Sequence, residues 1–297
     1  MKVGVDFGSS YIKVFVLHEN GEQEYKVFDV AKVNALIDYL IALKPKRVGY
    51  VGAGFERIRA QMEPVMKTLT FIPFPGADPI DAEVLAQVRG ARYQLFLNPL
   101  NETGLRFSGD DAVVVSIGSG VSYTVSGTRI VRSLIGNALG GSTLFWIAFQ
   151  MLPWGELDLV SALADENGQD STMGTADLYV KDLLPATKDL AIGKFVASHF
   201  GKRNASSTPE QWRSVVDLLV IGIVKDLMDS QALANAIEQA TGSRKPIQDI
   251  IAIGGTLEYI PCVKERLTAW CALIGMRVHI PKHPGHAGAI GAALFLD

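Results

Sequence analysis

The sequence is poor in cysteine and in long apolar runs, and each shortage excludes a class of protein. The 297 residues include two cysteines, Cys262 and Cys271, whose separation fits neither a disulfide framework nor a CxxC pair. We expect both to be buried thiols in a reducing cytoplasm. The longest apolar run, at residues 218–224, is far shorter than the ~18 residues that a membrane span needs. The first residues, MKVGVD, lead straight into a strand pattern, so no signal peptide is predicted.

Net charge is also small. A formal charge of -3 and a pI of about 6.0 give no electrostatic attraction to nucleic acid or to anionic membranes, so we expect neither as a partner. The five histidines, at positions 18, 199, 279, 283 and 286, show no metal-ligand spacing paired with carboxylates, which argues against a structural metal site. The remaining composition is that of a globular protein.

Residues 3–15 place a polar turn between two apolar strands, in the sequence VGVDFGSSYIKVF. The turn carries the carboxylate of Asp6, a glycine and two serine hydroxyls, with Lys13 in the second strand. Glycine lets the backbone approach phosphate oxygens, and successive N–H groups form an anion-binding concavity. An ordinary hairpin whose side chains cap its own backbone has the same composition, so this stretch alone does not show whether the turn binds phosphate.

The pattern of residues 3–15 restarts at Asp111, after strands and helices that alternate through the first third of the chain. Strand, glycine–serine turn, strand, turn and strand follow one another in DAVVVSIGSGVSYTVSGTRIVRSLIG. This weak internal repeat predicts an α/β protein of two lobes, residues 1–110 and 111–297, each with a phosphate-binding hairpin. A helix from Thr208 to Thr241 is predicted, whose apolar positions mark a core or dimer face.

Glycine and hydroxyl residues recur in four turns of this kind. Three directly follow an apolar strand, and the fourth opens a helix, where exposed N–H groups and the helix dipole favour an anion. The turns after strands are Gly8, Ser9 and Ser10; Gly118, Ser119 and Gly120; and Gly254, Gly255 and Thr256. The helix opens with Gly140, Gly141, Ser142 and Thr143.

The order of these turns resembles the actin/hexokinase/heat-shock chaperone class of ATPases, and within that class the type II pantothenate kinases. VGVDFGSSYIKV resembles the family's opening GIDxGGTxxKx, and SIGSGVSY is similar to its NIGSGVSI. LGGSTLFW, DLYVKDLL, VASHFGK and HAGAIGAALFLD resemble further family motifs, in the family's order. The resemblance covers the chain from residue 3 to its C-terminus.

The resemblance implies a two-lobed actin-like ATPase (ribonuclease H-like) fold with duplicated phosphate-binding β-hairpins, whose final helix packs back toward the N-terminal lobe. It implies a cytoplasmic homodimer that uses ATP and Mg²⁺ to phosphorylate pantothenate to 4'-phosphopantothenate, the first step of coenzyme A biosynthesis. Asp6 would hold the metal, and Ser9, Ser10 and Lys13 would bind the terminal phosphates. The turns at 118–120 and 140–143 would meet the phosphates from the opposite side, and the turn at 254–256 would bound the adenosine pocket.

The family's general base is a glutamate followed by glycine seven positions later, in a pattern like ExDAxxQG. EVLAQVRG, from Glu83 to Gly90, has the same spacing, so Glu83 would receive the proton of the substrate alcohol. A glutamate on a helix is otherwise a solvated surface residue. Asp81 is the alternative base.

One position departs from the family. Its arginine for the pantothenate carboxylate aligns with Ser133, and Arg132 lies one residue earlier. Because a shift of one residue turns a strand side chain to the other face, we predict a bulge near Leu134 that directs Arg132 into the pocket, beside Ser122 as a second substrate contact. The alternatives are a kinase of pantetheine or an amino sugar, or an ATP-driven activator that holds an iron–sulfur cluster through exposed cysteines. The two helical cysteines argue against the activator.

Overall fold

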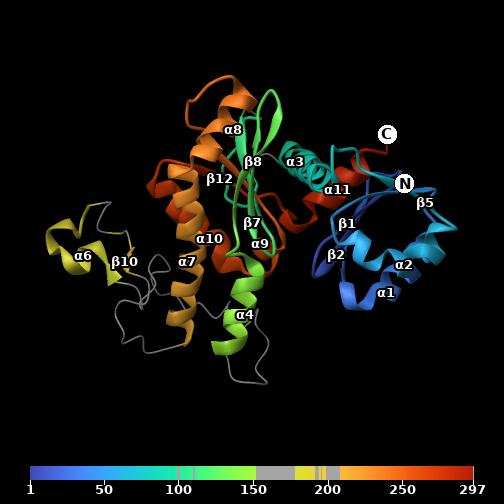
Figure 1. Ribbon diagram of the computed structural model, residues 1–297, viewed down its shortest axis with the longest axis horizontal. Coiled ribbons are helices and arrows are strands. Elements are labelled where there is room, and N and C mark those ends of the chain that lie inside the picture. The colour runs from blue at the N-terminus through green and yellow to red at the C-terminus, as the bar shows by residue number, and fades with distance from the viewer. Residues whose placement is uncertain are drawn as a thin grey trace.

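The computed structural model describes residues 1–98, 101–109, 111–151, 178–190, 194, 196–198 and 208–296. Of the motifs that carry the family resemblance, Asp177, residues 199–202 and Asp297 lie outside the described residues. The described chain contains two five-stranded mixed sheets with helices packed around them (Figure 1). Across these residues, every helix is too short or too polar to span a bilayer.

The N-terminal sheet has the strand order β3-β2-β1-β4-β5. Its strands are β1 (Lys2–Phe7), β2 (Tyr11–Leu17), β3 (Gln23–Asp29), β4 (Arg47–Val51) and β5 (Thr70–Pro73). The first three form an antiparallel meander, whereas β4 and β5 run parallel to β1. Because side chains alternate along a strand, Val3, Val5 and Phe7 pack against α1 (Val33–Leu43) and α2 (Phe55–Met66), and the opposite face of β1 is free for another helix.

The C-terminal sheet has the matching order β8-β7-β6-β11-β12. Its strands are β6 (Ala112–Ile117), β7 (Val121–Ser126), β8 (Ile130–Asn137), β11 (Asp249–Ile253) and β12 (Arg277–His279). Again three antiparallel strands are followed by two that run parallel to the first. The predicted α/β architecture with a repeated hairpin is therefore confirmed in topology.

Two helices cross between the sheets, α3 (Pro79–Leu97) and α11 (Ala287–Leu294), and lie side by side (Figure 1). Asp78 starts α3 by accepting hydrogen bonds from the amides of Ile80 and Asp81, both at 2.8 Å. The helices α3 and α11 touch at Gly90 and Gly291: a Cβ on Gly90 would lie 1.9 Å from a backbone oxygen of α11. Because neither glycine carries a Cβ, α3 and α11 can cross this closely. The crossing places the start of α3 between the sheets.

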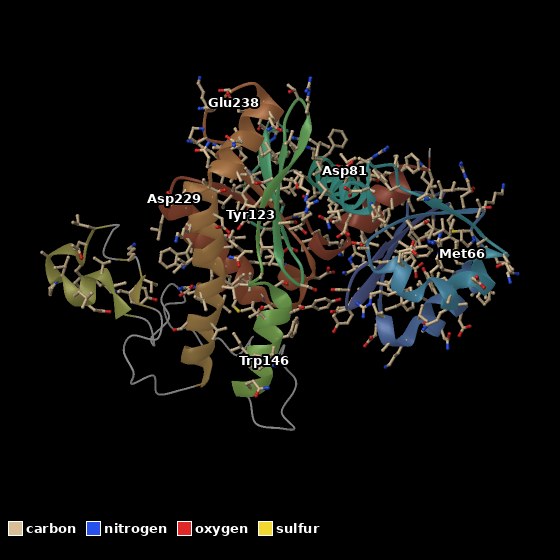
Figure 2. The ribbon with its side chains drawn as sticks, in the orientation of Figure 1. Met66, Asp81, Tyr123, Trp146, Asp229 and Glu238 are labelled. Atoms are coloured by element: carbon tan, nitrogen blue, oxygen red, sulfur yellow. The ribbon has the colours of Figure 1, made fainter. Side chains whose placement is uncertain are left out.

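The expected single helix from residue 208 to 241 is instead two helices, α7 (Thr208–Asp229) and α8 (Gln231–Thr241). Ser230 breaks it, because its backbone is extended and its hydroxyl accepts a hydrogen bond from Leu233 N at 3.1 Å as a helix N-cap. The buried apolar residues of α7 pack in the core of the C-terminal lobe, which is one of the two roles predicted for them. Tyr123 of β7 points toward this helix and donates to Asp226 Oδ2 at 2.8 Å (Figure 2).

The remaining elements are short or flank the cleft. They are α4 (Gly141–Met151), α6 (Val180–Leu183), α9 (Gly255–Tyr259), α10 (Pro261–Leu273), the strand pair β9 (Leu178–Tyr179) and β10 (Val196–Ser198), and the 3-10 helices η1 (Val30–Lys32), η2 (Pro185–Thr187) and η4 (Pro284–His286). Cys262 and Cys271 are buried thiols on α10, as the sequence predicts.

Candidate functional site

A cavity of about 620 Å³ opens between the two lobes. Both glycine–serine hairpins line it, together with α3, α9 and the first residues of α4 and α11. Of the site residues predicted from sequence, all line this cleft except Gly140 and Thr143. One cavity therefore collects residues that are far apart in the chain.

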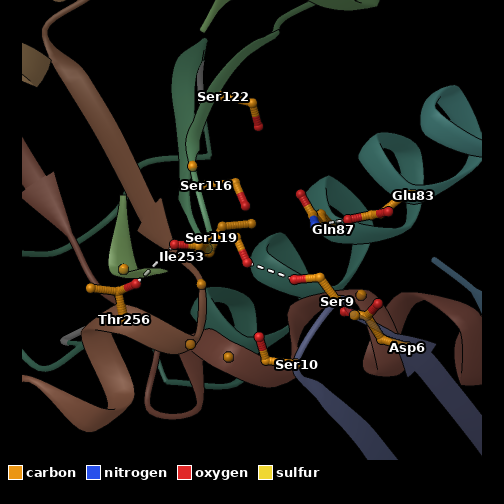
Figure 3. Close-up of a pocket in the computed structure, with 18 of the residues that line it drawn as sticks. Asp6, Ser9, Ser10, Glu83, Gln87, Ser116, Ser119, Ser122, Ile253 and Thr256 are labelled. Atoms are coloured by element: carbon orange, nitrogen blue, oxygen red, sulfur yellow. Dashed lines mark hydrogen bonds between the residues drawn. The ribbon is translucent and has the colours of Figure 1, made fainter. Parts of the chain in front are cut away.

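The two hairpin turns touch each other across the cleft. Ser9 Oγ lies 2.6 Å from Ser119 Oγ, so each hydroxyl is the partner of the other (Figure 3). The ammonium of Lys13 lies over the first turn, since a Cβ on Gly8 would come within 2.8 Å of Nζ. Lys13, which the resemblance assigns to the terminal phosphates, thus reaches the same space as the serines.

The start of α4 supports the second hairpin. Gly141 N donates to Gly118 O at 2.7 Å and Ser142 N donates to Ser119 O at 3.4 Å, so these two amides bind the turn. Gly140 packs behind it, where a Cβ would lie 2.4 Å from Ser119 O. Thr143 is bonded to the carbonyl of the preceding loop, at Ala138. The helix opening contributes Gly141 and Ser142 to the cleft wall, while Gly140 and Thr143 lie outside it.

Asp6 ends β1 at the floor of the cleft and faces α11. Its Oδ1 atom is buried and has no hydrogen-bond partner among the described residues. Burial raises the pKa of Asp6, and the nearby ammonium of Lys13 opposes this effect. Gly288 of α11 makes room for the carboxylate, since a Cβ there would lie 2.5 Å from Asp6 Oδ2. A buried oxygen without a partner, beside a phosphate-type hairpin, is suited to a hard cation.

Glu83 reaches the cleft from the first turns of α3, above the serine hairpins (Figure 3). Its Oε1 accepts a hydrogen bond from Gln87 Nε2 at 3.1 Å. Burial raises the pKa of Glu83 to about 7, and the nearby charge of Asp6 adds to this increase. A hydrogen bond from the Ala53 amide and the charges of Lys13 and Arg132 act in the opposite direction. A carboxyl that titrates near neutral pH can accept a proton from a substrate.

Asp81, the alternative base, is engaged elsewhere. Its Oδ2 accepts a hydrogen bond from Ala77 N at 2.9 Å, and its side chain does not line the cleft. The carboxylate thereby reinforces the turn that precedes α3. Its geometry favours a capping role over one in chemistry.

The pairing of β7 with β8 is irregular at the position where the family's arginine is expected. Ser122 pairs with Gly136 and Thr124 with Arg132, so residues 133–135 of β8 face the single residue Tyr123. Ser133 is buried and its hydroxyl accepts from Ile135 N at 3.3 Å, whereas Arg132 is exposed on the cleft. The predicted bulge near Leu134 is therefore present, and Arg132 and Ser122 both line the cavity.

Sequence reasoning missed two features of this region. Arg57 of α2 lines the cleft and donates from Nη1 to Ser9 O at 3.3 Å, although nothing in its amphipathic helix marks it. The fold also brings Glu258, His283 and His286 together, a grouping that the spacing of the histidines along the sequence did not reveal. No carboxylate is near the two histidines in sequence, because Glu258 joins them only through the tertiary fold.

No family model matches the chain. Among curated proteins, a type II pantothenate kinase from Staphylococcus epidermidis is 20% identical over 293 residues, which cover 98% of this chain and 99% of that protein. Among solved structures, the activator of the 2-hydroxyisocaproyl-CoA dehydratase from Clostridium difficile, with bound ADPNP, has a TM-score of 0.54 at 13% identity, over 99% of this chain and 93% of that chain. A ROK family glucokinase from Streptomyces griseus, in complex with glucose and AMPPNP, has a TM-score of 0.47 at 15% identity, over 99% of this chain and 98% of that chain.

The likeness to the dehydratase activator agrees with the two matching sheets and the crossed helices between them. The chain has the actin-like ATPase fold. In sequence, it is a distant, full-length match to type II pantothenate kinase.

Proposed function

We propose that the protein is an ATP- and Mg²⁺-dependent kinase that phosphorylates pantothenate to 4'-phosphopantothenate. The observation that carries this proposal is the meeting, in one cavity, of Glu83 with a pKa of about 7 and two serine hairpins. The full-length match to a type II pantothenate kinase supports it. We extend the proposal to a cytoplasmic homodimer on the resemblance alone.

The hairpins would bind the terminal phosphates of ATP. Their serine hydroxyls and glycine amides offer donors from both sides, and Lys13 adds a cation over the first turn. Phosphoryl transfer needs alignment and charge neutralisation more than covalent chemistry, and this arrangement supplies both. Entry of the phosphates would separate Ser9 from Ser119.

The residues present fit a magnesium ion at the first strand. Asp6 would hold it, directly or through water, because its buried Oδ1 has no partner among the described residues. The ion, when bound, supplies positive charge that neutralises the phosphates in transfer. Gly288 has no side chain, so it leaves room for the carboxylate of Asp6 at this position.

Glu83 would act as general base. As the primary alcohol oxygen of the acceptor attacks the γ-phosphorus, its proton passes to a carboxylate oxygen of Glu83, and the bond from γ-phosphorus to the ADP oxygen breaks. Gln87 holds Glu83 Oε1 by a hydrogen bond of 3.1 Å and so limits its rotation. The bond that forms and the bond that breaks involve the same phosphorus, and the products are the phosphate ester and ADP.

The substrate's carboxylate would bind Arg132, which reaches the cleft beside the β8 bulge. An arginine forms charge-assisted, bidentate bonds with a carboxylate. Because Ser133 stands at the family's arginine position, a neutral acceptor such as pantetheine, or an amino sugar, is the second candidate. The activator alternative lacks support from the cysteines: both are buried, and burial raises the pKa of Cys271 to about 12.

The test is the release of ADP from ATP and Mg²⁺ with pantothenate, pantetheine and amino sugars as separate acceptors, with mass spectrometry of the products. We expect release that depends on pantothenate and yields its phosphate ester. ADP release that is the same with and without any acceptor would contradict a kinase. Phosphorylation of amino sugars alone would contradict the substrate. Sedimentation of the purified chain tests the homodimer.

A further inference from the structure

A second polar cluster lies behind the cleft, where η4 meets α9. Glu258, His283 and His286 each direct one ligand atom into a common space, and these atoms all lie within 4.8 Å of one another. Two imidazoles and one carboxylate form a common zinc-binding set, with water as the fourth ligand. We propose that this cluster binds a zinc ion.

The tautomer of His286 is the first argument. Its Nε2 lies 3.2 Å from the carbonyl oxygen of Lys26, an acceptor only, so Nε2 carries the hydrogen. In the neutral ring, Nδ1 then presents a lone pair. That atom is buried, makes no hydrogen bond to a described residue, and lies 3.4 Å from Glu258 Oε1. Two electron-rich atoms that face each other need a positive charge between them, either a proton or a metal ion.

His283 favours the metal over the proton. A proton on His286 would satisfy the pair with Glu258 but leave no role for a third ligand atom in the same space. The His283 ring is held by Tyr25, whose ring stacks on it at 3.7 Å between centroids. This stacking holds the His283 ring beside the other two ligand residues.

Outer contacts already orient the ligands as a metal site requires. The Lys26 carbonyl fixes His286, and Gly285 N donates to Glu258 Oε2 at 3.1 Å, which leaves Oε1 for the ion.

The position of the cluster gives the ion a structural role. Lys26 and Tyr25 belong to β3 of the N-terminal sheet, whereas Glu258 belongs to α9, whose Gly255 and Tyr259 line the cleft. A zinc ion there would tie η4 and α9 together against β3. It would fix the cleft floor without entering the cavity.

The experiment is a titration of chelator-treated, full-length protein with Zn²⁺ alone, by calorimetry and by thermal unfolding. We expect one ion per chain and a rise in Tm. With Co²⁺ as a second probe, we expect the visible absorption of a four-coordinate site. Glu258→Gln and His283→Asn should each weaken Zn²⁺ binding by about 100-fold or more, beyond the 10–100-fold of outer-contact changes.

Two control variants separate this site from others. His18→Asn removes a ring that also faces a carboxylate, that of Glu24 at 3.7 Å, and should keep zinc binding. Asp6→Asn should keep it as well, which distinguishes the cluster from the proposed magnesium site. Far-UV circular dichroism of each metal-free variant shows that it folds, and the partly exposed His283 is the site least expected to disturb the core.

The proposal is overturned if Zn²⁺ binds no more tightly to the parent protein than to folded His283→Asn. It is equally overturned if NMR shows both nitrogens of His286 protonated in protein that contains zinc, because the cluster is then an ion pair.

Discussion

Ser9 Oγ and Ser119 Oγ lie 2.6 Å apart, so the glycine–serine turns of the two lobes are in direct contact. Each serine follows the end of a strand at the same place in its own sheet, β1 and β6. Both side chains are exposed on the cleft, so water can replace the contact at little cost. The contact is therefore well placed to open when phosphate enters between the turns.

We expect Ser9→Ala and Ser119→Ala each to raise the Kd for ATP–Mg²⁺ by about 10- to 150-fold, because each removes a hydrogen bond to a charged phosphate worth about 1.5–3 kcal/mol. Stability should change by less than about 0.5 kcal/mol, since both serines are exposed. Isothermal calorimetry measures the affinity. Ser243→Ala, a turn hydroxyl that binds Lys245 N outside the cleft, is the matched control. If Ser9→Ala and Ser119→Ala bind ATP–Mg²⁺ as tightly as Ser243→Ala and the parent protein do, the turns do not bind phosphate.

Asp6→Asn should lower turnover by orders of magnitude while the protein folds normally, because it removes charge from the proposed metal site. Gly288→Ala should act on the same carboxylate by sterics, since its Cβ would lie 2.5 Å from Asp6 Oδ2. Turnover at saturating Mg²⁺, with circular dichroism for folding, measures both. Unchanged turnover in well-folded Asp6→Asn would exclude a metal role for this residue.

For Glu83 we expect a pH dependence of kcat/KM. The pKa of about 7 belongs to a carboxyl that faces Asp6, Lys13 and Arg132, and only its ionised form accepts a proton. Activity should therefore rise with pH through about 7 and level off above it. Glu83→Gln should cut kcat by about 10²–10⁴-fold and abolish this dependence.

Asp81→Asn is the control for Glu83 on the same helix, because Asp81 binds Ala77 N outside the cleft. It should keep most of its activity. If Asp81→Asn is inactive and Glu83→Gln is fully active, the base is Asp81.

The sheets and the hairpins could be predicted from sequence because their signals are local. Alternating apolar residues around Gly8 and Gly118 mark strand, turn and strand within a dozen residues, and the repeat of this pattern predicts two lobes. Glu83 and Arg132 were found through motif spacing, which carries information that periodicity does not. The break at Ser230 was missed because the apolar pattern runs on through it.

What the sequence could not predict depends on tertiary contact. His286 meets the Lys26 carbonyl across 260 positions, and Glu258 joins it from another helix. Arg57 reaches Ser9 only because α2 packs beside the first hairpin. The close approach of Gly90 and Gly291 likewise depends on how α3 and α11 cross.

Stability should depend on one buried ion pair that joins α7 to α10. Asp217 Oδ1 accepts from Arg266 Nε at 2.6 Å and from Trp270 Nε1 at 3.0 Å, and both charged side chains are almost fully buried. Asp217→Asn removes the carboxylate charge that the buried guanidinium of Arg266 faces, so we expect a loss of about 3–5 kcal/mol in the free energy of unfolding.

Urea denaturation measures this loss. Glu238→Gln breaks the exposed pair with Arg244 and should cost less than about 1 kcal/mol, which makes it the matched control. If Asp217→Asn and Glu238→Gln lose similar amounts of unfolding free energy, the buried pair contributes no more to stability than the exposed pair does.

The last prediction concerns the carboxylate of the substrate. Arg132 precedes the bulge in β8 and lines the cleft, while Ser133 points into the core. Arg132→Ala should raise the KM for pantothenate by about 10²-fold, equivalent to about 2–3 kcal/mol of lost binding, with a smaller effect on kcat. Steady-state kinetics with ATP at saturation measures both constants.

Two comparisons make this result specific. The KM for pantetheine, which lacks the carboxylate, should not change in Arg132→Ala, because the lost interaction is with that group. Arg57→Ala removes the other guanidinium that reaches the cleft near Ser9, and should leave the KM for pantothenate unchanged. If Arg57→Ala raises that KM and Arg132→Ala does not, the carboxylate binds beside the first hairpin. If the parent protein prefers pantetheine, the cleft selects a neutral acceptor, because a desolvated carboxylate without its arginine costs more than an amide that keeps its hydrogen bonds.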